Sequence, residues 1–181
     1  LEQLLQQGAD GWVVTIWDPA AAQQCLQAGI GGHVKLAVGG KTDDEHGTTQ
    51  SISGTVGTLN DGAYEEFERR HGGGRRHAQG LTAVVRVPCP NGNGLLVLNS
   101  ERQSPNSIHQ ITSVGIVPQQ QKILAAKGAI APRAAYEPVS PHLIEVDSGG
   151  ACWIGRGPEA YQRARQNLYE WTVTSTTGEQ R

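Results

Sequence analysis

Methionine is absent from the 181-residue chain, aromatic residues are few, and only three cysteines are present. Cys25, Cys89 and Cys152 are more than 60 residues apart, so the chain has no CxxC pair. An odd number of widely spaced cysteines excludes a complete disulfide framework. This cysteine usage is typical of a reducing compartment, and we therefore expect a cytoplasmic protein.

Long apolar runs and a strong charge of one sign are also lacking. No stretch approaches the roughly 20 apolar residues that cross a bilayer, and no charged start precedes an apolar signal segment. The 15 basic and 17 acidic residues give a net charge of -2, which provides no global attraction toward nucleic acid or acidic membranes. We expect a soluble protein without membrane contact, for which nucleic acid is not a favoured partner.

The missing methionine includes position 1, where a complete reading frame would begin with one. Residues 1–7 (LEQLLQQ) already follow an amphipathic helical pattern, with no capping residue before them. We therefore expect the chain to begin inside a longer protein. Its length suits one domain with a substantial core.

Common catalytic and metal-binding motifs are missing or incomplete. HExxH and GxSxG do not occur, and residues 39–42 (GGKT) resemble the end of a phosphate loop in which Lys35 replaces the first glycine. Asp43, Asp44 and His46 are close in sequence, but without a second donor cluster they favour a solvated turn over a metal site. The motifs therefore predict no catalytic residue, metal ligand or cofactor in this chain.

The first half of the chain predicts an α/β unit followed by antiparallel strands. The run 12–17 (WVVTIW) is typical of a strand, and Asp18 with Pro19 favours the start of a helix over 20–28. Alternating patterns then predict an antiparallel ribbon of four strands. These strands are expected over 33–38, 51–59, 83–87 and 94–99.

The second half predicts a helix near 107–114, a buried strand at 123–126, a helix opening at Pro132 and a strand over 142–146. Together these patterns predict the α/β class, in a single domain with a mixed sheet, flanking helices and an antiparallel ribbon. We place that domain at 1–155. A divergent terminal helix and tail are expected at 156–181, where apolar residues recur at helical spacing.

Two basic features are candidates for binding. Residues 69–80 (RRHGGGRRHAQG) predict a mobile loop whose four arginines favour an anion over a divalent cation, although an unliganded, solvated loop is the commoner arrangement. Arg133 lies in the first turn of a predicted helix, where the helix dipole disfavours a cation. A nearby carboxylate or bound anion would explain it, and pairing with Glu137 or simple exposure to solvent is the alternative.

The order of several short segments resembles the carboxy-terminal domain of the microcystinase C (MlrC) family of zinc metallopeptidases, from about Leu4 to Asp147. The family pattern contains a Pro-bearing turn after a strand, GGK, SxR, GIxP and a final K followed by RAAFEP. Here the corresponding segments are IWDP at 16–19, GGK at 39–41, SER at 100–102, GIVP at 115–118 and, at 127–138, Lys127 followed by RAAYEP.

The resemblance implies a division of labour between two domains. The family's zinc ligands belong to an amino-terminal domain that nothing in this chain matches, so the chain alone is expected to be inactive and to hold no metal. Its expected role is one wall of the cleft, with Arg133, Lys127 and Arg102 binding a peptide substrate. The chain has Ala131 and Pro132 where the family has His-Phe. The alternative is a non-catalytic module that binds an anion or nucleic acid through the loop 69–80.

Overall fold

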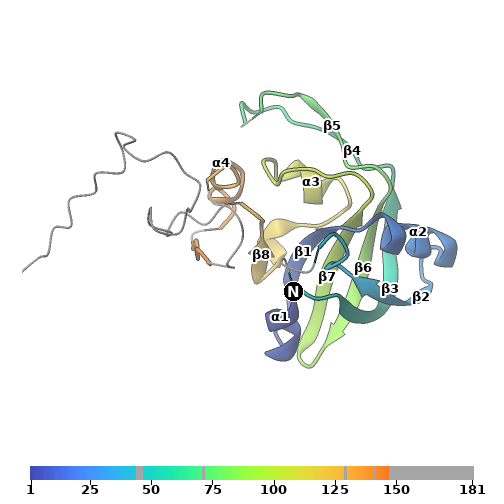
Figure 1. Cartoon of the computed structure of the whole chain (residues 1–181). Helices are drawn as coiled ribbons and strands as arrows, with labels where there is room; N and C mark the ends of the chain where they lie inside the picture. Colours follow the sequence, from blue (N-terminus) through green and yellow to red (C-terminus); the bar gives the residue numbers. More distant parts are fainter. Residues whose placement is uncertain (44–46, 71, 129, 141, 147–181) are drawn as a thin grey trace, which may run out of the picture. The chain divides into compact units, whose positions relative to one another are not determined.

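The computed structural model describes residues 1–43, 47–70, 72–128, 130–140 and 142–146. The residues up to Glu145 form one compact unit. Six strands in this unit form the main sheet: β1 (Trp12–Trp17), β2 (His33–Val38), β3 (Gln50–Asn60), β6 (Thr82–Cys89), β7 (Gly92–Asn99) and β8 (Ile123–Ala125). Their spatial order is β2-β3-β6-β7-β1-β8 (Figure 1).

The sheet is mixed, which confirms the predicted α/β class. β1 lies between β7 and β8 and is parallel to both, with Val13 opposite Leu95 and Leu124. In the series β2-β3-β6-β7 each strand is antiparallel to the next, so the segments predicted as a ribbon form the antiparallel half of the main sheet. A separate two-stranded ribbon pairs β4 (Ala63–Glu65) with β5 (Arg76–Ala78).

The predicted unit at 12–28 forms as the sequence indicates. The β-branched and aromatic run becomes β1, and helix α2 (Pro19–Ala28) follows it directly. Asp18 is the N-cap of α2, and its side chain accepts a hydrogen bond from the backbone N–H of Ala21. Gly29 ends the helix with a positive φ of 72°, a conformation that costs glycine little.

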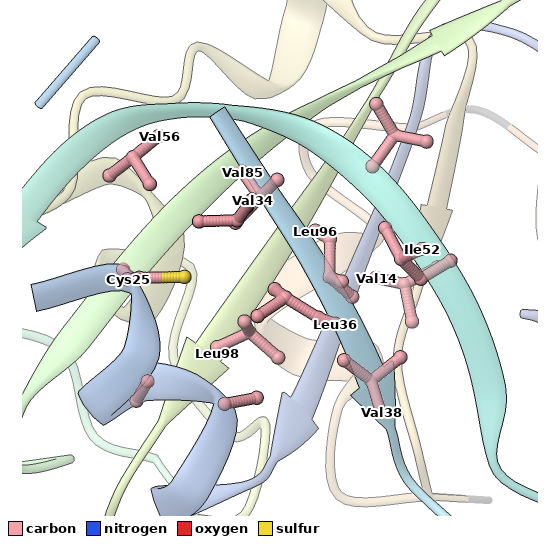
Figure 2. Packing of buried hydrophobic residues seen from close by; sticks show 14 of the residues in the cluster. Val14, Cys25, Val34, Leu36, Val38, Ile52, Val56, Val85, Leu96 and Leu98 are labelled. Carbon is pink, nitrogen blue, oxygen red and sulfur yellow. The ribbon is translucent and has the colours of Figure 1, made fainter. Parts of the chain in front are cut away.

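On one face of the sheet, side chains of β1 and β7 pack against helix α2 and against side chains of β2 and β3. Successive residues of a strand point to opposite faces, so Trp12 and Val14 lie on this side and Val13 on the other. The side chains of β2 reach the same apolar cluster as those of β1 and β7, as Figure 2 shows. The sheet therefore curls, and the cluster contains Val14, Cys25, Val34, Leu36, Val38, Ile52, Val56, Val85, Leu96 and Leu98.

The Trp12 side chain packs in this core against Gly94 of β7. The side chain is fully buried, and its Nε1 donates to the carbonyl of Ala9 at 3.0 Å. A Cβ atom at Gly94 would lie 2.0 Å from the indole ring, so only glycine allows this approach.

The opposite face is covered by two single-turn helices, α3 (His109–Thr112) and α4 (Arg133–Tyr136). Both are shorter than the helical stretches predicted around 107–114 and after Pro132, and Pro132 is the N-cap residue of α4 rather than its first helical residue. The apolar cluster on this face joins the sheet to these segments. It includes Val13, Val84, Val97, Ile111, Val114, Ile116, Ala135 and Tyr136.

Two strand predictions require correction. β8 is a three-residue edge strand with Ile123 exposed, whereas the sequence predicted a buried strand. The strand predicted over 142–146 is wrong: these residues have no regular secondary structure, and Ile144 is 82% exposed. The alternating pattern does not produce a strand here, because no described strand pairs with these residues.

The remaining described helices are α1 (Glu2–Gln6) and the 3-10 turn η1 (Pro118–Gln120). Within the described part of the chain, no helix combines the length and apolar character that a membrane span requires. The predicted boundary at 155/156 and the predicted terminal helix lie outside the described residues.

Candidate functional site

The carboxyl ends of β1 and β7 bring together side chains that are far apart in sequence. Asp18 follows β1 directly, and its backbone N–H donates to the carbonyl of Asn99 at the end of β7 at 3.0 Å. Trp17, the last residue of β1, donates from Nε1 to the carbonyl of Ser100 at 3.0 Å. The segment 99–102 is thereby held beside the first turn of α2.

Asp18 is buried and fully engaged in structural contacts. Oδ1 accepts from Ala21 N–H, Oδ2 accepts from Gly39 N–H at 3.1 Å, and Lys41 Nζ lies 2.9 and 2.7 Å from the two oxygens. The GGK segment, which resembled a phosphate loop, therefore neutralises a buried carboxylate. The DP and GGK segments form one structural unit that joins β1 to the end of β2.

Arg102 stacks on Trp17 at the same edge. The guanidinium carbon is 4.1 Å from the centre of the indole ring, within the range of a cation–π interaction. Trp17 is 39% exposed and Arg102 is exposed, so the pair lies at the surface. Among the described residues, no carboxylate pairs with Arg102 and no acceptor takes a hydrogen bond from it.

Arg102 lines an open hollow of about 350 Å³ between the β4–β5 ribbon and the segment 102–107. The walls are mainly polar, and positive side chains outnumber negative ones. We call this feature the basic hollow and define it by Tyr64, Glu66, Arg70, Arg76, His77 and Arg102. On the side of the hollow formed by the β4–β5 ribbon, the rings of His77 and Tyr64 stack with their centres 5.1 Å apart. His77 Nε2 also donates to the carbonyl of Gly74 at 2.8 Å.

The basic segment 69–80 is more structured than the mobile loop that its sequence predicted. Residues 76–78 form β5, and Arg75 and Arg76 each pair with Glu65 at 3.8 and 3.3 Å. Arg70 pairs with Glu66 at 3.7 Å. These ion pairs neutralise part of the positive charge, which disfavours a polyanion such as nucleic acid as the ligand.

Glu66 remains charged although it is buried. Burial raises the pKa of Glu66, but hydrogen bonds from the Ser107 side chain and the Glu68 backbone, with the positive charges of Arg70 and His109, lower it below the usual 4.5 overall. The carboxylate therefore compensates Arg70 and leaves Arg102 as the uncompensated cation of the hollow.

The other two predicted site residues do not line the basic hollow. Arg133 belongs to α4, and its guanidinium pairs with Glu145, not with Glu137. Lys127 follows β8 and is exposed. Arg70 connects the two regions, because its guanidinium also donates to the carbonyl of Ala134 beside Arg133. Of the three predicted residues, the basic hollow contains Arg102 alone.

The described residues contain no group of three or more His, Cys, Asp or Glu side chains that could hold a metal ion. They therefore do not form a zinc site by themselves. Asp43 lies among the described residues, while Asp44 and His46 lie outside them.

A family model described as the MlrC C-terminus matches residues 1–154. The chain belongs to this family. Microcystinase C from Sphingomonas sp. is 27% identical to it over 134 residues, which cover 74% of this chain and 24% of that protein. This MlrC C-terminus chain thus corresponds to about a quarter of the length of its curated relative, and the family resemblance in its motifs is confirmed.

The fold of the MlrC C-terminus chain also matches a solved structure. A crystal structure described as a "Putative metallopeptidase" from Mesorhizobium sp. BNC1 superposes with a TM-score of 0.66 at 18% identity. The match covers 77% of this chain and 27% of that one. At this identity the likeness establishes the fold.

The sequence singled out Arg102 through its SxR motif but gave no sign of the hollow around it. In the sequence, Trp17 was interpreted only as part of a predicted strand, and Tyr64 and Glu66 belong to no recognised motif. The signal that could have connected Trp17 with Arg102 is their position, because each lies at the carboxyl end of a strand and β1 and β7 are parallel neighbours.

Proposed function

We propose that this chain is the carboxy-terminal domain of a zinc metallopeptidase and forms one wall of the cleft that binds the peptide substrate. The observation that carries the proposal is the family match over residues 1–154. The likeness to microcystinase C and the fold shared with a crystal structure described as a metallopeptidase support the same reading.

The proposal assigns the metal to another part of the protein. Among the described residues, no group of three or more His, Cys, Asp or Glu side chains could hold a metal ion, which supports placing the metal elsewhere in the protein. This chain should be inactive alone. Its own contribution is positioning: Arg102, Arg133 and Lys127 offer cationic N–H donors to carbonyl or carboxylate oxygens of a peptide. Arg133 would exchange or share its present partner, Glu145.

The expected partner is the amino-terminal, metal-bearing domain. Several large apolar side chains are exposed between residues 117 and 144, a stretch that includes the edge strand β8, which is unusual for a surface in contact only with water. A domain interface would cover them. These side chains are Val117, Ile123, Ile130, Leu143 and Ile144.

Elemental analysis tests the proposed division of labour. Zinc is measured per protein on the complete gene product and, as a matched control, on the 181-residue chain purified alone. We expect zinc in the first and none in the second, and we expect Arg133→Ala in the complete product to lower peptide hydrolysis without changing its zinc content. Stoichiometric zinc in the 181-residue chain, or none in the complete product, would refute the proposal.

A further inference from the structure

The guanidinium of Arg102 is held in place without an acidic partner. Trp17 supports it from one side at 4.1 Å, and the Trp17 ring is itself fixed through the hydrogen bond from Nε1 to Ser100. Stacking uses the face of the guanidinium and leaves its in-plane N–H groups available. Because the side chain is already positioned, less conformational freedom is lost when a ligand binds.

The other arginines of the basic hollow already have carboxylate partners. Arg76 pairs with Glu65, and Arg70 pairs with Glu66. Arg102 therefore provides the one cation in the basic hollow, within the described residues, that has no carboxylate partner. A single guanidinium with a free edge matches a planar anion with two oxygens and one negative charge.

We propose that the basic hollow is a carboxylate subsite, in which Arg102 binds both oxygens of a peptide carboxylate and Trp17 acts as its positioning residue. The carboxylate comes from an acidic side chain or from the end of a peptide chain. The inference rests on the proposed function only in taking a peptide as the ligand. Binding at the hollow is measured on this chain without hydrolysis, so the two proposals fail independently.

Binding affinity is measured by isothermal titration calorimetry of the 181-residue chain and its variants. Where Trp17 is present, NMR of its indole N–H signal locates the bound peptide. The probes are acetyl-Ala-Glu-Ala-amide, its Gln analogue, and acetyl-Ala-Ala-Ala with a free terminal carboxylate. We expect at least one carboxylate peptide to bind about tenfold or more tightly than the Gln analogue, because hydrogen bonds to charged groups are the stronger ones. The two carboxylate probes separate a side-chain from a terminal source.

Variants identify the group that binds. Arg102→Ala should weaken binding of the preferred peptide about tenfold or more, and Arg102→Lys should restore it only partly, because lysine lacks the planar fork. Trp17→Phe keeps an aromatic face and should retain most of the affinity, whereas Trp17→Leu should lose it. Arg86→Ala, on an exposed position of β6 outside the hollow, is the matched control and should bind like the unaltered chain.

For the Arg102 and Trp17 variants, an unchanged indole N–H chemical shift of the buried Trp12 reports that the fold is intact. The assignment would be overturned if neither carboxylate peptide bound more tightly than the Gln analogue, or if Arg102→Ala left the affinity of the preferred peptide unchanged. Tighter binding of inorganic phosphate than of both carboxylate peptides would also overturn it.

Discussion

The ion pair between Lys41 and Asp18 should stabilise the fold more than a surface pair does. Lys41→Met keeps the length of the side chain and removes its charge, while Asp18→Asn keeps an N-cap and removes the negative charge. Asp18 is 1% exposed, and the Lys41 side chain is 40% exposed. Removing one partner of a fully buried pair costs about 3–5 kcal/mol, and the partial exposure of Lys41 reduces the expected cost to about 1–3 kcal/mol.

The interaction itself is measured by a double-mutant cycle. The free energy of unfolding is obtained from urea titrations of the unaltered chain, both single variants and the double variant, followed by tryptophan fluorescence. We expect a coupling energy of about 1–2 kcal/mol between the two positions. The reason is that a carboxylate shielded from water interacts more strongly with its counter-ion.

Lys122 and Asp10 provide a matched control. They approach to the same 2.7 Å, but their side chains are 66% and 17% exposed. Exposed pairs contribute about 0.2–1 kcal/mol, so the cycle with Lys122→Met and Asp10→Asn should give a smaller coupling energy. A coupling at Lys41 and Asp18 that is no larger than at this control would refute the reasoning from burial.

Two further predictions concern stability. Gly94→Ala should destabilise the chain by about 2–3 kcal/mol in urea titrations, because its Cβ would lie 2.0 Å from the Trp12 ring. Gly57→Ala, whose Cβ meets nothing closer than 3.6 Å, should stay within about 0.5 kcal/mol, and equal effects would contradict the packing argument. The pKa of Glu66 is lowered by folding, so its stabilising contribution is present above the usual pKa of 4.5 and is lost as the pH falls through the lower folded value. Glu66→Gln should therefore lose less stability than the unaltered chain on acidification below pH 4.5, and identical pH profiles would contradict this assignment.

Local signals in the sequence were sufficient where neighbouring residues determine the structure. The β-branched run of β1, the cap at Asp18 and the glycine after α2 each act within a few residues, and each formed as predicted. Alternating patterns likewise located the antiparallel strands. The same kind of pattern failed at 142–146, because alternation produces a strand only where a sheet face and a neighbouring strand are available.

The candidate site depends on contacts that no local pattern encodes. Lys41 reaches Asp18 because β2 curls over the sheet, and Arg102 reaches Trp17 because β1 and β7 are parallel neighbours. The charge of the segment 69–80 was also misleading when read alone. Three of its four arginines pair with Glu65 or Glu66, which lie outside the basic run.

The two edges of the main sheet affect how the chain can aggregate. An edge strand offers unpaired backbone groups to which another chain can add, and long, flat, apolar edges are the most hazardous. β8 has only three residues. β2 has six residues, and the charged Lys35 is one of its exposed side chains. Neither edge offers a long apolar template for cross-β growth. Self-association of the isolated chain should therefore involve the exposed apolar side chains between Val117 and Ile144 rather than a sheet edge.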